Sequence, residues 1–160
     1  MNMSSRIKVV LGMLLFAGYI NAQMLSSKDV LDIKAELIGA DPPVIELKLD
    51  IKEGWHVNSN NPIDEFLTPT MVTIKDTTLF SAITIEYPAP DILKLEFSET
   101  ELSLFHDVAV IKIILTPKEN FNKNNFTVEG EVSYQPCNDQ TCLFPAKKSF
   151  SVSYKKEVEE

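Results

Sequence analysis

The sequence has 160 residues, two cysteines and a formal net charge of −8, with acidic residues outnumbering basic ones. This length suits one domain with a substantial core and is short for two ordinary domains. The acidic balance argues against binding to nucleic acid or to an anionic membrane surface, since both attract basic proteins.

Residues 1–22 are predicted to be a secretory signal peptide. Arg6 and Lys8 form a basic start, residues 9–20 are apolar, and Ala22 offers a small residue for cleavage. The apolar run is short for a bilayer span and no second run follows, so we expect a soluble exported chain; an uncleaved N-terminal anchor is the alternative. Cleavage removes Arg6 and Lys8 from the 15 basic residues, which leaves 13 basic against 23 acidic residues and a charge of −10.

The first half of the exported chain contains one clear strand. Residues 30–37 have an ambiguous periodicity that fits a strand or a helix. Residues 45–51 alternate between apolar and charged side chains, which is the period-two pattern of a strand with one buried face. After Val57, which can face a core, residues 58–62 are predicted to form a polar loop and residues 70–74 a short strand.

The second half of the chain is richer in strand patterns. Residues 83–87 alternate, whereas residues 91–105 are irregular and fit a loop or a hairpin. Residues 108–115 form a dense apolar run, as expected for a central strand with little solvent on either face. Two long alternating strands follow, at residues 126–134 and 149–154.

Seven or eight short strands without an amphipathic helix predict an all-β domain, an immunoglobulin-like two-sheet sandwich. This domain is expected to span residues 23–155, followed by a charged tail at residues 156–160. The two cysteines are close neighbours in sequence, so they cannot form the inter-sheet bridge usual in such sandwiches. A bond between them therefore lies at the periphery of the fold.

Both cysteines lie in the segment YQPCNDQTCLFP, residues 134–145, between the last two predicted strands. Four polar turn-forming residues separate Cys137 from Cys142, so the chain can reverse and bring the sulfurs within bonding distance. So short a ring stabilises a fold by only about 2 kcal/mol in the loop-entropy treatment. From the residues alone, a redox-active pair and a structural disulfide both remain open, and export favours either kind of bond.

Two histidines offer further alternatives. Zinc held by the cysteines together with His56 and His106 is a third possibility, although these histidines lack the close spacing of familiar zinc modules. His56 itself is interpreted as a strand histidine hydrogen-bonded beside Trp55. A catalytic base is the less favoured interpretation, because no nucleophile pattern accompanies this histidine.

Several motifs resemble those of a known family. GWHVNSNNP at residues 54–62, PT at 69–70, YPAP at 87–90 and above all YQPCNDQTCLFP are similar to landmarks of the N-terminal periplasmic domain of the thiol:disulfide interchange protein DsbD. The resemblance covers nearly the whole exported chain and implies an immunoglobulin-like sandwich. It also implies a periplasmic domain that receives reducing equivalents from a thioredoxin-like domain. Such a domain passes them to oxidised periplasmic proteins, such as disulfide isomerases or cytochrome c maturation proteins.

The same resemblance implies roles for individual residues. Cys142 corresponds to the sulfur that forms a mixed disulfide with a partner, and Cys137 to the sulfur that resolves it. Phe97 is the candidate for an aromatic cap over the pair, and Tyr134 and Phe144 can add apolar cover against stray oxidants. The resemblance implies neither a cofactor nor a metal.

Departures from the family pattern bear on the partners. Four residues separate the cysteines where the well-known form has five, and Ala146 stands where a second proline often follows. The sequence shows no further apolar span and no thioredoxin-like motif, so we expect a separate membrane electron transporter and thioredoxin-like protein to supply electrons. The competing hypothesis is a non-catalytic β-sandwich module that binds a protein or glycan and uses the disulfide to rigidify a loop.

Overall fold

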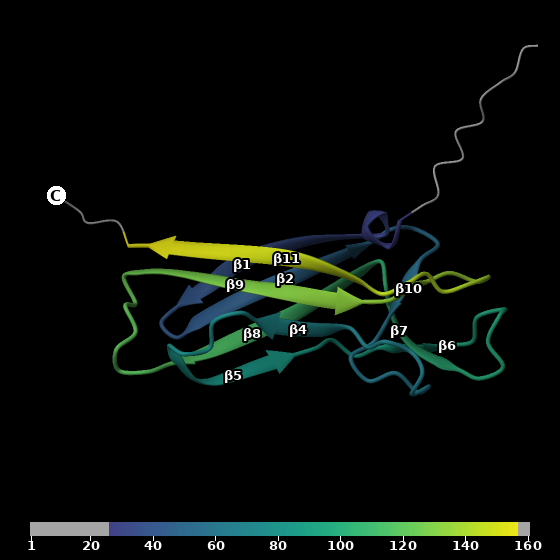
Figure 1. The fold of residues 1–160 in the computed structure, drawn as a ribbon, viewed down its shortest axis with the longest axis horizontal. Helices are drawn as coiled ribbons and strands as arrows, with labels where there is room; N and C mark the ends of the chain where they lie inside the picture. Colours follow the sequence, from purple (N-terminus) through teal and green to yellow (C-terminus); the bar gives the residue numbers. More distant parts are fainter. Residues whose placement is uncertain (1–25, 157–160) are drawn as a thin grey trace, which may run out of the picture.

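A computed structural model describes residues 26–156 as a β-sandwich with a smaller third sheet at one end (Figure 1). The predicted signal peptide and residues 157–160 of the predicted charged tail lie outside the described residues. A single turn of 3-10 helix, Ser27–Asp29 (η1), precedes the first strand. Within residues 26–156, no helix is long and apolar enough to cross a membrane.

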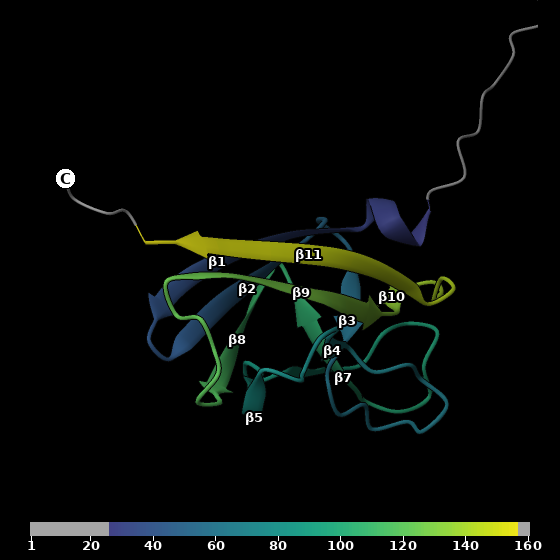
Figure 2. The same ribbon diagram turned by 60° about the vertical axis from the view of Figure 1, so that its left-hand side comes forward.

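Two antiparallel sheets form the body of the sandwich. The first has the strand order β1-β2-β8-β5 and the second has the order β11-β9-β4. Figures 1 and 2 show them as facing layers, and β11 contacts β1 at one edge. The strands of these two sheets are Leu31–Ala40 (β1), Pro43–Ile51 (β2), Met71–Ile74 (β4), Phe80–Glu86 (β5), Val108–Pro117 (β8), Asn125–Tyr134 (β9) and Ala146–Lys155 (β11).

Period-two patterning accounts for the long strands. In β2, Ile45, Leu47 and Leu49 are completely buried, whereas the charged residues between them keep contact with solvent. The ambiguous residues 30–37 belong mostly to strand β1, where Ile33 pairs with Leu49 of β2. The neighbouring strand therefore decides between the two conformations that the local pattern allows.

The main core lies between the two sheets and is almost entirely apolar. Strand β8 is an interior strand of its sheet, as predicted, but only one of its two faces is buried. Ala109, Ile111 and Ile113 are buried, whereas Val108 is 48% exposed and Lys112 is exposed. The prediction of little solvent on either face is thus wrong, because only the inner face of β8 packs against the opposite sheet.

The third sheet extends the sandwich at one end and has the order β10-β3-β7-β6. Asp107, with a positive φ of 52°, separates β7 from β8, and β10 follows β9 after one residue. The irregular segment at residues 91–105 is a hairpin of β6 and β7, one of the two alternatives predicted for it. The strands are His56–Asn58 (β3), Asp91–Leu93 (β6), Leu102–His106 (β7) and Pro136–Cys137 (β10).

These elements confirm the predicted all-β, immunoglobulin-like sandwich. The third sheet is the feature that matters for function, since its strand β10 carries the first cysteine. In Figure 1 the third sheet lies at the end of the molecule where β10, β7 and β6 are labelled, and β10 is its edge strand, next to β3.

Candidate redox site

Cys137 and Cys142 form a disulfide at the end of the molecule that carries the third sheet. Their Sγ atoms are 2.07 Å apart and their Cα atoms are 3.9 Å apart. The intervening turn is closed by Asn138, whose N–H donates to the Thr141 carbonyl. The side-chain oxygen of Asn138 accepts from the backbone N–H groups of Gln140 and Thr141, each at 2.9 Å. The polar loop thus brings the sulfurs together through Asn138, a typical turn residue.

The two cysteines differ in exposure. Cys137 lies on β10, pairs with His56 of β3 and is completely buried. Cys142 follows the turn and is only partly buried. A thiolate from another protein can therefore approach Cys142 more readily than Cys137, and attack at an accessible sulfur is what exchange requires.

A small hydrophobic cluster surrounds Cys137 on the outer side of the third sheet, apart from the main core. We call it the satellite cluster. Strand β7 contributes two of its leucines, and the loops before β4 and after β6 contribute others. Its buried members are Leu95, Leu102, Leu104 and Cys137, and its partly buried members are Leu67, Leu93 and Cys142.

A network of two side-chain amides holds the segments around the cysteines together. Asn58 is completely buried, and its Nδ2 donates to the Thr68 carbonyl at 3.0 Å and to Gln135 Oε1 at 3.2 Å. Gln135 Oε1 also accepts from the Thr68 N–H at 2.9 Å, and its Nε2 donates to the Leu143 carbonyl at 3.3 Å. The loop before β4 is thereby tied to both sides of the disulfide.

Sequence reasoning missed this network. It assigned Asn58 to a polar loop, whereas the structure places Asn58 at the end of strand β3 and buries it. Its side chain is held by Thr68, 10 residues further along the chain, and by Gln135, 77 residues further along. The one available signal was its position within the GWHVNSNNP motif.

The three residues predicted to cover the disulfide occupy different environments. Tyr134 is completely buried in the main core, and its hydroxyl donates to the Ser27 carbonyl at 3.2 Å. Burial, with the nearby Asp32 and Asp29, raises the pKa of Tyr134 to about 12. Phe144 is 88% exposed, and Phe97, two residues after Leu95 of the satellite cluster, is 41% exposed.

The two histidines lie side by side next to Cys137. His56 pairs with Cys137 on one side and with His106 on the other, and the two imidazole rings have centroids 6.0 Å apart. His106 Nε2 lies 2.8 Å from an oxygen of Asp91, and its Nδ1 lies 3.0 Å from an oxygen of Asp107. Among the described residues, no three His, Cys, Asp or Glu side chains are arranged to hold a metal ion.

His56 lies on strand β3 beside Trp55, as the sequence predicted, but the hydrogen bond expected for its ring is not formed at Nδ1 within residues 26–156. Its Nδ1 is buried and has no hydrogen-bond partner in the described part of the chain. Burial lowers the pKa of His56, and the neighbouring His106 acts in the same direction. Asp139, the Cys137 backbone and Asp107 oppose this shift, and the net effect favours a neutral imidazole next to the disulfide.

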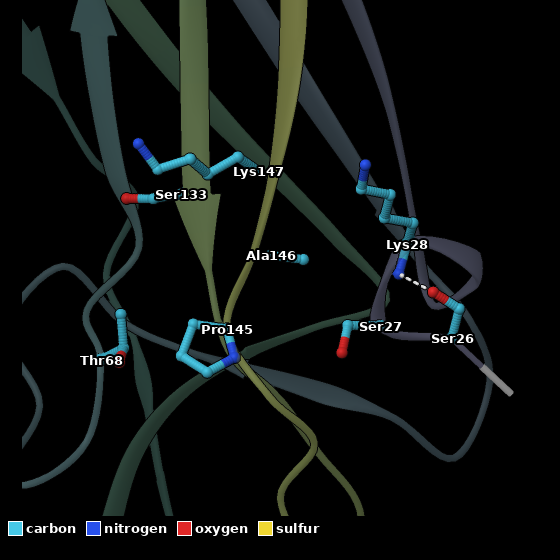
Figure 3. Close-up of a pocket in the computed structure, with 8 residues that line it drawn as sticks. All are labelled: Ser26, Ser27, Lys28, Thr68, Ser133, Pro145, Ala146 and Lys147. Carbon is cyan, nitrogen blue, oxygen red and sulfur yellow. Dashed lines mark hydrogen bonds between the residues drawn. The ribbon is translucent and has the colours of Figure 1, made fainter.

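An open pocket of about 610 Å³ lies beside the chain that leaves the disulfide. Figure 3 shows Pro145 and Ala146 on one side of it and the η1 residues on the other. Neither cysteine lines this pocket. The chemistry of the site therefore resides in the disulfide and the side chains packed against it.

The disulfide is peripheral, with one buried and one partly buried cysteine, and it is carried by an immunoglobulin-like sandwich. Comparison with known families then identifies the class of protein. The model of the family "Thiol:disulfide interchange protein DsbD, N-terminal" matches residues 21–154, and the chain belongs to this family. No protein with a curated description matches the sequence significantly.

Solved structures share the fold. The reduced N-terminal domain of DsbD from Neisseria meningitidis aligns with a TM-score of 0.54 and 11% identity, covering 82% of this chain and 91% of that one. The N-terminal periplasmic domain of ScsB from Proteus mirabilis aligns with a TM-score of 0.53 and 12% identity. In that case the alignment covers 82% of this chain and 49% of the other.

Proposed function

We propose that the domain relays reducing equivalents in the periplasm through the Cys137–Cys142 pair. The observation that carries the proposal is the unequal exposure of the two cysteines, with Cys137 buried and Cys142 partly accessible. This arrangement supports Cys142 as the sulfur attacked by a partner and Cys137 as the resolving sulfur. The proposal includes export through residues 1–22, with residues 23–155 as the exchange domain.

The exchange reaction balances as two thiolate attacks. A thiolate of a reduced donor attacks Cys142 Sγ, the Sγ–Sγ bond breaks, and Cys137 leaves as a thiolate that takes up a proton. The second donor thiol loses its proton and attacks the donor sulfur of the mixed disulfide, which releases Cys142 as a thiolate that is then protonated. The donor is oxidised to a disulfide, and two electrons and two protons have moved to the cysteine pair.

The reverse sequence reduces an acceptor. Cys142 attacks the disulfide of an oxidised periplasmic protein, and Cys137 then attacks Cys142 Sγ to close the ring and release the reduced acceptor. We propose a thioredoxin-like protein fed by a membrane electron transporter as the donor. The acceptors are oxidised periplasmic thiol proteins, including those of cytochrome c biogenesis.

Exposed aromatic side chains support docking of protein partners near the disulfide. Phe144 lies two residues beyond Cys142 and Phe66 lies next to Leu67 of the satellite cluster, and both are 88% exposed. Phe97 adds a third ring from the loop that also contributes Leu95. In this proposal, partner binding covers Phe144 and displaces the loop carrying Phe97, while Tyr134 supports the cysteine segment from the core.

Trapping of mixed disulfides tests the proposal. A Cys137→Ala variant keeps the accessible thiol but cannot resolve an intermediate, so it should accumulate a disulfide-linked complex with a thioredoxin-like protein in periplasmic extract. The matched Cys142→Ala variant keeps only the buried thiol and should trap far less. Equal trapping by both variants contradicts the assigned roles, and no complex with either contradicts the relay.

The reduction potential separates the relay from a structural disulfide. A value below about −300 mV marks a bond that resists the thiol pools around it, and this outcome favours the binding-module alternative. A relay requires a higher potential, close to those of its donors and acceptors. The potential follows from equilibration with glutathione or dithiothreitol buffers.

A further inference from the structure

The side chain of Asn58 points at the buried sulfur of the disulfide. Asn58 is the last residue of strand β3, and His56, two residues earlier, is paired with Cys137. Because side chains alternate along a strand and paired residues share a face, the Asn58 and Cys137 side chains lie on the same face of the third sheet. Asn58 Oδ1 lies 4.0 Å from Cys137 Sγ, and both residues are completely buried. The contact is therefore shielded from water.

Neighbouring backbone groups determine which atom of the carboxamide faces the sulfur. The Thr68 N–H can only donate, so the Gln135 atom that it contacts is the oxygen, Oε1. The Asn58 atom that contacts both Gln135 Oε1 and the Thr68 carbonyl is then the nitrogen, Nδ2. The oxygen of Asn58 is left facing Cys137 Sγ.

This oxygen has no hydrogen to accept in the oxidised protein. A disulfide sulfur carries no hydrogen, and within residues 26–156 no other group donates to Asn58 Oδ1. A buried acceptor without a donor destabilises the state in which it occurs. Reduction changes this, because Cys137 then carries an S–H group next to the carboxamide oxygen.

We propose that Asn58 is a positioning residue that accepts a hydrogen bond from the Cys137 thiol in the reduced protein. The bond forms only after the Sγ–Sγ bond has broken and Cys137 Sγ has taken up its proton. The buried acceptor is satisfied in the reduced state and unsatisfied in the oxidised state, so it shifts the equilibrium toward the dithiol. This role rests on the proposed relay, in which the donor must reduce the Cys137–Cys142 disulfide again after each transfer.

The redox equilibrium with glutathione tests this role. In an Asn58→Ala variant the oxidised state no longer contains the unsatisfied acceptor and the reduced state loses its hydrogen bond, so the equilibrium constant for disulfide formation should rise about two- to tenfold. For a two-electron couple this corresponds to a reduction potential lower by about 10 to 30 mV. An unchanged or smaller constant overturns the proposal.

A matched control separates this effect from general loosening of the site. Thr70 is also completely buried, and its hydroxyl donates to the Asn58 carbonyl at 2.6 Å. A Thr70→Val variant removes a buried hydrogen bond to the same residue and leaves the carboxamide in place. It should lower stability but leave the glutathione equilibrium unchanged, and an equal shift in both variants overturns the specific role of Asn58.

A measurement that leaves Asn58 intact keeps the proposal testable if the Asn58→Ala variant does not fold. In a Cys142→Ala variant, Cys137 is the only thiol, and its S–H stretching band should lie at the lowered frequency of a hydrogen-bonded thiol. A band at the frequency of a free thiol overturns the proposal. If His56→Gln moves the band to the free position, His56 is the acceptor instead. Each outcome is independent of whether a mixed disulfide with a partner is trapped.

Discussion

The main core and the satellite cluster differ in size and in chemistry. The main core joins twenty buried apolar side chains, most of them from long strands, whereas the satellite cluster has four buried members from β7, β10 and a loop. The buried polar side chains of the described chain are Asn58, Ser59, Thr70 and Ser103, and they lie around β3 and β7 in the third sheet. Ser59 and Ser103 share a hydrogen bond of 2.8 Å between their hydroxyls.

The main core therefore contributes mainly to the stability of the domain, whereas the satellite cluster and its polar neighbours surround the disulfide. Apolar burial between the two large sheets stabilises the fold without directing any group toward a reactant. Buried polar groups around the disulfide cost free energy unless they are paired, but they give the sulfur a defined environment. We therefore expect substitutions in the main core to change stability alone and substitutions near Cys137 to change the redox equilibrium as well.

A pair of core truncations gives the largest expected effect and tests this separation directly. Ile111→Ala in the main core should lower the free energy of unfolding by about 3 to 5 kcal/mol, because Ile111 is completely buried between the sheets. Leu104→Ala in the satellite cluster should cost about 2 kcal/mol, since a smaller cluster covered by loops can relax around the cavity. Urea unfolding measures both changes.

The redox equilibrium of the same two variants sharpens the comparison. Leu104 packs in the cluster that contains Cys137, so Leu104→Ala should alter the equilibrium constant with glutathione, whereas Ile111→Ala should leave it unchanged in the folded protein. A change of equal size in both variants shows that the two regions are not separable.

The pH dependence of stability gives a smaller effect confined to the redox end. Burial lowers the pKa of His56 from its usual 6.5, opposed in part by Asp139. Well above pH 6.5 the imidazole is neutral in both the folded and the unfolded chain, so it has no effect on stability there. As the pH falls below 6.5, the unfolded chain binds the proton first, and the free energy of unfolding decreases until the pH passes the lowered pKa.

Comparison with a His56→Gln variant isolates this contribution from the titration of carboxylates. Unfolding midpoints in urea, measured between about pH 7.5 and about pH 5, should fall more steeply for the natural protein than for the variant. Parallel slopes in the two proteins contradict a neutral, partly buried imidazole beside the disulfide.

The smallest effect on stability is expected at Phe144, where the effect on exchange should be clear. Since this ring is 88% exposed, Phe144→Ala should change the free energy of unfolding by no more than about 0.5 kcal/mol. In the Cys137→Ala background it should reduce the yield of trapped partner about fivefold, as expected for loss of an aromatic docking contact. Ile38→Ala, near the end of β1 that lies away from the disulfide, serves as the control and should trap normally.

Sequence patterns were sufficient for most of the fold. Alternation in residues 45–51 and 126–134 correctly predicted β2 and β9, because a strand with one buried face imposes a period of two on its own residues. The disulfide was also within reach of sequence reasoning, since its ring closes over four turn-forming residues and needs no distant partner.

Long-range contacts decided the rest. Residues 30–37 became a strand through pairing with β2. Asn58 became a strand residue through pairing with Leu104 of β7, and its side chain is held by Gln135 and Thr68. The burial of Cys137 and the exposure of Cys142 likewise follow from pairing with β3 and packing on β7, neither of which leaves a local pattern. The sequence by itself thus determined most of the extended segments and the place where the sulfurs meet. Only the tertiary structure showed that Cys137 is buried and Cys142 partly exposed, because exposure depends on residues that lie far away along the chain.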